Sequence, residues 1–124
     1  MATRASGSQN PKLDEVTDLA TLSSISDDII LSCLRERYLS GHLYTAIGSN
    51  AVVVVNPYKY TPSSGDATLV QYAMEFREVA EEKTYRDPHV FQLANNAYYN
   101  MRRTGQDQSI LMRYASASAE KIAF

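Results

Sequence analysis

The residues of this chain best suited to binding chemistry are Asn56, Pro57, Tyr58 and Lys59, which directly follow the apolar run 51–55. Proline fixes the loop backbone, an asparagine side chain can bond both backbone and ligand, and a flat aromatic ring beside a cation suits a purine. The same residue types are also common in a turn that ends a strand. The four residues by themselves therefore leave both a ligand site and an ordinary turn open.

A second pattern concerns phosphate binding. The stretch 107–111 reads D-Q-S-I-L, and such a strand followed by G-x-x-x-x-G-K-[ST] would form a P-loop, whose backbone N–H groups hold phosphates. Residues 114–121 instead read Y-A-S-A-S-A-E-K, without glycine. A side chain at a positive-φ glycine position costs about 1–2 kcal/mol, and Glu120 would repel a phosphate. The sequence predicts no phosphate cradle here, no nucleotide cofactor for this chain alone and no catalysis by it.

The other reactive side chains do not form a cluster in the sequence. His42 and His89 stand beside expected helix ends, with no cysteine or carboxylate at ligand spacing, so we expect structural roles and no metal site. Cys33 falls on the apolar face of an expected helix, which is typical of a packing residue. Three arginines at 102, 103 and 113 are expected at a solvated helix end. The chain offers no candidate catalytic residue.

Composition limits the classes of partner. The 124 residues carry 12 basic and 14 acidic side chains, for a net charge of −2, which argues against nucleic acid as a partner. One cysteine excludes an internal disulfide, and the N-terminus lacks the apolar core of a signal peptide. The longest wholly apolar run, 51–55, is far too short to span a bilayer. We therefore expect a cytoplasmic location, without membrane contact by this segment.

The elements that position these residues follow from local patterns. Residues 1–12 are polar and are expected to be a disordered tail. Ser26, Asp27 and Asp28 signal a helix start, and Gly41 its end. Its buried face is expected to hold Ile30, Cys33, Leu34 and Tyr38. Residues 43–46 and 51–55 flank a turn and predict a hairpin, whose second strand, apolar throughout, is expected to be buried on both faces.

Two further helices are expected. The first begins at Asp66, with Leu69, Tyr72, Ala73, Phe76 and Ala80 on its buried side. The second begins with Asp87 as cap and Pro88 in the first turn and ends at Gly105. Its buried face is expected to hold Phe91, Ala94, Ala97, Tyr98 and Met101. A short strand is expected at 109–112, which completes an α/β pattern.

The order of these elements resembles the start of a myosin motor domain, just ahead of its P-loop. The motifs that carry the resemblance are N-P-Y-K at 56–59, D-P-H-V-F-Q-L-A-N-N-A-Y-Y-N-M at 87–101 and D-Q-S-I-L at 107–111. It spans about Asp18 to Leu111. Further details are most similar to the myosin-like head of fungal chitin synthases, namely D-D at 27–28, L-R-E-R-Y at 34–38, N-N-A-Y-Y at 95–99 and M-R-R-T-G-Q-D-Q at 101–108.

This resemblance implies an α/β, partial myosin-head fold of P-loop NTPase-like architecture, with helices around an incomplete central sheet. Residues 13–113 would be its N-terminal segment, and 114–124 a divergent end in place of the P-loop. Asn56, Pro57, Tyr58 and Lys59 would border the adenine, although Ser64 stands where conventional myosins usually have a tyrosine. No metal ligand is implied in this chain.

The resemblance also implies what the intact parent does. The parent head would bind ATP and magnesium and be linked with actin filaments. It would precede a glycosyltransferase that makes chitin from UDP-N-acetylglucosamine, at the plasma membrane, septum or secretory vesicles, with the head in the cytoplasm.

Two interpretations of the chain stay open. It is either a truncated motor-like head without catalysis, or a non-catalytic pseudo-motor module that binds a partner through its unpaired sheet edge or through Tyr72, Tyr98 and Tyr99. A natural terminus, a splice product and a gene-model error would each account for the divergent end.

Overall fold

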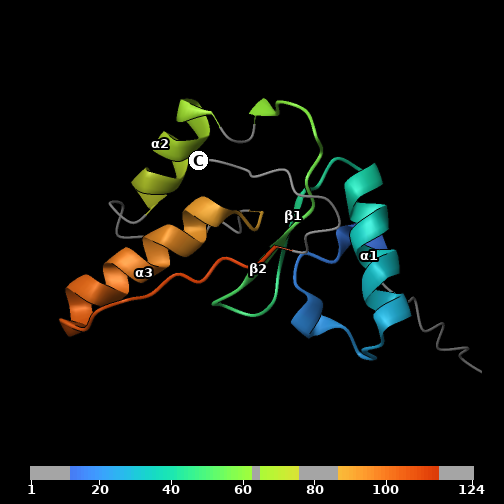
Figure 1. Cartoon of the computed structure of the whole chain (residues 1–124), viewed down its shortest axis with the longest axis horizontal. Coiled ribbons are helices and arrows are strands. Elements are labelled where there is room, and N and C mark those ends of the chain that lie inside the picture. Colours follow the sequence, from blue (N-terminus) through green and yellow to red (C-terminus); the bar gives the residue numbers. More distant parts are fainter. Residues whose placement is uncertain (1–11, 63–64, 76–86, 115–124) are drawn as a thin grey trace, which may run out of the picture.

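The computed structural model describes residues 12–62, 65–75 and 87–114. A two-stranded hairpin lies centrally, with helix α1 on one side and helices α2 and α3 on the other (Figure 1). The protein is thus a small mixed helix and strand structure, and its sheet has two strands within the described ranges. Within those ranges no helix is long and apolar enough to cross a membrane.

Helix α1 (Asp27–Leu39) begins and ends where the sequence predicts. The Ser26 hydroxyl accepts a hydrogen bond from the Ile29 N–H at 3.3 Å, and two acids follow in the first turn. Gly41 takes φ +87°, and the next residue donates its N–H to the Arg37 carbonyl at 2.8 Å. The local cap chemistry therefore decides both ends.

The buried face of α1 packs on two short 3₁₀ turns, η1 (Leu13–Glu15) and η2 (Leu19–Thr21), and encloses the main hydrophobic cluster. Cys33 is fully buried against Val16 and Leu19, and Ile30 and Leu34 pack at the edge of this cluster. The expected burial of Tyr38 is wrong, since its side chain is exposed. Arg37, one position earlier, occupies the buried side instead.

Strands β1 (Tyr44–Ala46) and β2 (Val52–Val54) form the predicted antiparallel hairpin, with Thr45 opposite Val53. The turn contains Gly48 at φ +63°, and its N–H donates to the Asp18 carboxylate at 2.9 Å. The expectation that β2 is buried on both faces is wrong, because Val54 is 50% exposed. An apolar strand is covered only where other elements pack on it, and the two-stranded sheet leaves this end of β2 open.

Helix α2 (Asp66–Glu75) begins at the predicted acid and buries Tyr72, as expected. Leu69 and Ala73 are exposed, contrary to expectation, and the predicted contacts of Phe76 and Ala80 lie outside the described residues. The helix packs on α3, whose Asn95 side chain donates to the Tyr72 carbonyl at 2.7 Å.

Helix α3 (Val90–Thr104) ends at Gly105, as predicted, with φ +68° and a bond from the Gly105 N–H to the Met101 carbonyl. Its start is two residues later than predicted, because the cap is His89 and not Asp87. The expected buried face is correct only in part, since Phe91 and Ala97 are half-buried whereas Ala94, Tyr98 and Met101 are exposed. This side of α3 has no neighbouring helix or strand on it within the described residues.

The strand expected at 109–112 is not formed, and Ile110, Leu111 and Met112 are exposed. The segment after α3 turns back along this helix (Figure 1), where the Asn100 side chain donates to the Gln108 side chain at 2.9 Å. The expected tail lies outside the described residues except for Lys12, and so does the divergent end beyond Tyr114.

Candidate functional site

The four residues Asn56 to Lys59 form a tight turn at the end of β2. The Asn56 carboxamide oxygen accepts the Tyr58 N–H at 2.8 Å, and this bond closes the turn around Pro57. Tyr58 has φ +51°, a conformation that non-glycine residues adopt rarely. The structure therefore brings these residues together as a backbone turn whose asparagine is engaged with the chain itself.

The side chains of this turn point outward. Tyr58 is 85% exposed, Lys59 is exposed, and Pro57 is partly buried. The next residue, Tyr60, is also exposed, and its hydroxyl lies close to Gly65 at the start of α2. The turn and the residue after it thus present two aromatic rings and one ammonium group on an open surface. It has the groups to stack on a flat ring and to neutralise an anion, but it encloses no ligand by itself.

Arg37 connects the elements behind this turn. Its guanidinium donates to the Thr45 hydroxyl at 2.9 Å, the Tyr44 carbonyl at 3.0 Å and the Asp14 carbonyl at 2.9 Å. The side chain is 1% exposed, and within the described residues it has no carboxylate at ion-pair distance. Because a buried cation must be hydrogen-bonded to be tolerated, these three neutral oxygens fix α1, η1 and β1 to one another.

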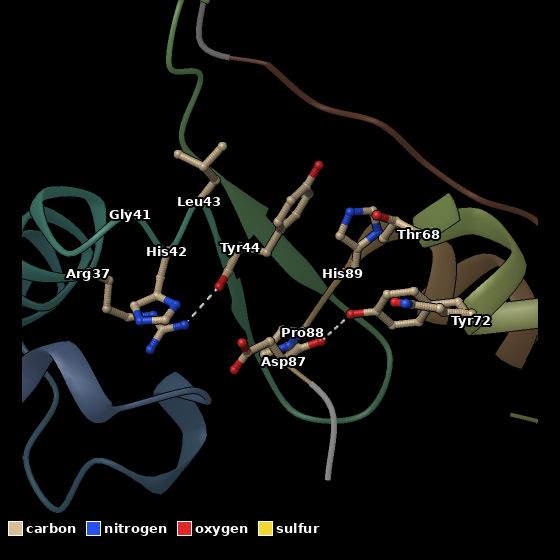
Figure 2. A pocket seen from close by; sticks show the side chains of 11 residues that line it. Arg37, Gly41, His42, Leu43, Tyr44, Thr68, Tyr72, Asp87, Pro88 and His89 are labelled. Carbon is tan, nitrogen blue, oxygen red and sulfur yellow. Dashed lines mark hydrogen bonds between the residues drawn. The ribbon is translucent and has the colours of Figure 1, made fainter. Parts of the chain in front are cut away.

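A cavity of about 470 Å³ lies between the Arg37 end of α1 and the α2 side of the molecule (Figure 2). Tyr44, Thr68 and Gln71 line its walls, and Asp87 contributes the acidic group. The Tyr72 hydroxyl donates to the Asp87 carbonyl at 2.8 Å across one side of it. The lining mixes one cation, one acid and neutral groups, and the N-P-Y-K turn does not contribute to it.

His89 sits in the wall of this cavity, packed among aromatic rings. Its ring centroid lies 4.1 Å from that of Tyr44, 5.0 Å from that of Tyr72 and 4.5 Å from that of Phe91. The imidazole Nδ1 accepts the Phe91 N–H at 3.1 Å and so caps α3. The structural role expected of His89 is confirmed, and it is more specific than the sequence indicated.

Cys33 is the buried packing residue that the sequence predicts. Its thiol donates to the Leu13 carbonyl at 3.3 Å. Burial raises the pKa of the Cys33 thiol, and the nearby charge of Arg37 opposes this effect. A protonated, inaccessible thiol is a poor nucleophile. Within the described ranges, no group of three or more His, Cys, Asp or Glu side chains is placed to hold a metal ion.

Sequence reasoning missed Arg37 and the cap formed by His89. Arg37 follows Ile30, Cys33 and Leu34 at helical spacing, so a polar residue within an apolar stripe was the available signal. His89 precedes an apolar residue directly, but histidine is not among the preferred cap residues. Ser64 and Glu120, which bear on the nucleotide interpretation, lie outside the described residues.

Comparison with known proteins agrees with the sequence resemblance. A model of the myosin head (motor domain) family matches residues 16–121. The chain is 41% identical over 111 residues to chitin synthase 8 of Mycosarcoma maydis, in an alignment that covers 87% of this chain and 6% of that protein. It is 41% identical over 108 residues to chitin synthase 5 of Cryptococcus neoformans var. grubii, covering 77% of this chain and 6% of that protein.

Myosin heavy chains are also similar. The identity to the non-muscle myosin heavy chain of Drosophila melanogaster is 38% over 102 residues, covering 82% of this chain and 5% of that protein. The chain thus spans only about one-twentieth of the length of these curated relatives. The match extends through the helices, the hairpin and the N-P-Y-K turn described above.

Proposed function

This chain belongs to the myosin head family, and we propose that it forms the adenine-side, N-terminal part of a motor-like head of the chitin synthase type. In this proposal the complete head has P-loop NTPase-like architecture and binds ATP with magnesium. Asn56, Pro57, Tyr58 and Lys59 border the adenine, and no residue of this chain holds the metal.

The observation that carries the proposal is the turn itself. It begins two residues after the end of β2 and exposes an aromatic ring and an ammonium group, and Arg37 is hydrogen-bonded to the neighbouring strand β1. The hydrogen bond from the Tyr58 N–H to the Asn56 side chain forms this turn without a ligand, and a preformed turn loses little entropy on binding. Its open shape is compatible with a site that further parts of the head complete.

The chain by itself is proposed to be non-catalytic. Residues 114–121 offer no glycine for a phosphate cradle, and Glu120 has the wrong charge for it. Actin filaments, the rest of the motor and a chitin-forming glycosyltransferase are proposed partners of the parent. In such a parent, this segment would lie on the cytoplasmic side of the plasma membrane, septum or secretory vesicles.

Calorimetric titration tests the nucleotide part of this proposal. We expect the chain to bind magnesium ATP more weakly than about 1 mM, since the phosphate contacts that supply most of the affinity are lacking. A hybrid head that carries residues 16–111 of this chain followed by a family-type P-loop and the remaining motor is expected to bind in the micromolar range. Saturable binding by the chain alone below about 100 µM would overturn the expectation that this chain lacks a phosphate site.

A pseudo-motor interaction module is the second candidate, favoured by the exposed apolar side chains of Leu31, Leu39 and the 110–112 segment. Analytical ultracentrifugation with thermal unfolding separates the two. A module of this kind is expected to be monodisperse with one cooperative transition, whereas a part of a larger head is expected to self-associate through uncovered apolar surface.

A further inference from the structure

His89 is one of the residues through which the α2–α3 pair meets the hairpin. The closest packing between elements joins α1 with η1, β1 with β2, α2 with α3, and β1 with η2. The imidazole contacts Tyr44 from β1, Tyr72 from α2 and Phe91 from α3. It also lines two cavities, of about 470 and 30 Å³. The ring therefore lies between the hairpin and the α2–α3 pair and contacts both (Figure 2). Gln92, Leu93 and Asn96 of α3 also line the smaller cavity beside the hairpin.

The imidazole of His89 caps the first turn of α3 only while its Nδ1 is unprotonated. Its Nδ1 accepts the Phe91 N–H at 3.1 Å, which requires a lone pair on that nitrogen. A doubly protonated imidazole has N–H donors at both nitrogens, so the Phe91 N–H would then face a second donor. Because this bond is partly buried and His89 is 5% exposed, its loss is expected to destabilise the first turn of α3.

We propose that His89 is a pH-sensitive joint, in which protonation of the imidazole removes the cap of α3 and releases this helix from the hairpin. The proposal goes beyond the nucleotide function proposed above and does not depend on it. Because the ring turns out of its site to be protonated, the joint is closed at neutral pH and loosens as the pH falls below about 6.5, where an unperturbed histidine takes up its proton.

Some groups around the His89 ring favour the protonated imidazole and others oppose it. Tyr44 and Tyr72 approach it from β1 and α2, and their ring faces attract a cation, as does that of Phe91. The acid of Asp87, the cation of Arg37 and the second histidine, His42, line the same cavity. Burial disfavours the protonated imidazole, and so does the Phe91 N–H, which points at Nδ1 from 3.1 Å. This second effect is present only while the cap of α3 is formed.

The chain offers a matched control, because it contains two histidines and the other one, His42, is exposed. Thermal unfolding of the full chain is measured at pH 7.5 and 5.5, above the usual titration of carboxylates. The wild type and His42→Gln are expected to lose about 3–6 °C on acidification, the shift that the loss of one cap, about 1 kcal/mol, produces in a chain of this size. His89→Asn, which keeps a capping side chain that does not titrate, is expected to lose less than half of that amount.

A local measurement distinguishes the joint from general acid destabilisation. Hydrogen exchange of the Phe91 amide, corrected for its intrinsic pH dependence, is expected to lose protection at pH 5.5 in the wild type and in His42→Gln but not in His89→Asn. An equal loss of unfolding temperature in His89→Asn and the wild type would overturn the proposal. Unchanged protection of the Phe91 amide in the wild type would overturn it as well.

Discussion

Replacement of Arg37 by methionine tests whether this buried cation holds α1, η1 and the hairpin together. The substitution keeps an unbranched side chain but removes the three donors to the Asp14 and Tyr44 carbonyls and the Thr45 hydroxyl. Each bond from a charged donor contributes about 1.5 kcal/mol or more, and unpaired buried acceptors are costly. The substitution also removes the desolvation penalty of a buried charge that has no carboxylate partner, which offsets about 1–2 kcal/mol of this loss. We therefore expect a net loss of about 3 kcal/mol in the free energy of unfolding.

The assay is urea unfolding of the full chain, followed by circular dichroism. With a slope near 1.5 kcal/mol/M, a loss of this size lowers the midpoint by about 2 M. Arg35→Met is the matched control, because Arg35 lies two residues earlier on α1 and is exposed. Its expected change is within about 0.5 kcal/mol. Equal, small changes in the two variants would refute the view that Arg37 organises this half of the molecule.

Three further predictions follow from burial and backbone conformation. The pKa of the Cys33 thiol is raised in the folded state, so the stabilisation that this thiol contributes is complete below its pKa in the unfolded chain, near 8.5, and is lost as the pH rises through its folded pKa. The urea midpoint should therefore fall more between pH 8 and 9.5 in the wild type than in Cys33→Ala. Val53→Asp should destabilise the fold far more than Val54→Asp, because Val53 packs on the core and Val54 is half-exposed. The expected cost of Val54→Asp is about 1 kcal/mol, and similar urea midpoints for the two variants would contradict the observed register. Gly105→Ala should cost about 1 kcal/mol through its φ of +68° alone, since no atom lies within 4 Å of the added methyl group; an unchanged melting temperature would show that the end of α3 does not need this conformation.

The parts of the fold that the sequence predicted correctly depend on short-range chemistry. Ser26 begins α1, Gly41 and Gly105 end helices with positive φ, and the 47–50 turn joins the hairpin. Each of these features is decided by a few consecutive residues, so the pattern is visible without knowledge of the rest of the molecule.

Burial was predicted less well, because it depends on elements distant in sequence. The valines of β2 and the residue Tyr98 on α3 have apolar or aromatic side chains, yet Val54 and Tyr98 are exposed where no other element covers them. Conversely, the charged side chain of Arg37 is buried because three oxygens from η1 and β1 converge on it. Such convergence cannot be read from the spacing within α1 alone.

For the candidate site, the sequence indicated which residues lie together but not how their side chains are used. The N-P-Y-K motif forms one turn, as its composition favours, and its asparagine bonds the backbone of Tyr58. The adenine role of Asn56 to Lys59 stays a prediction from the family, and it concerns the outward side chains of this turn.

The most direct test of this role compares two ligands in the hybrid head that carries residues 16–111 and a family-type P-loop. The affinities of ATP and inorganic triphosphate are measured by calorimetry for the parent hybrid and for its Asn56→Ala, Lys59→Ala double variant. We predict that the variant weakens ATP at least about tenfold, or 1.4 kcal/mol, while triphosphate changes little, because the turn contacts the base side of the ligand. Equal losses for both ligands would contradict this prediction and would show that the turn supports the fold and not the adenine.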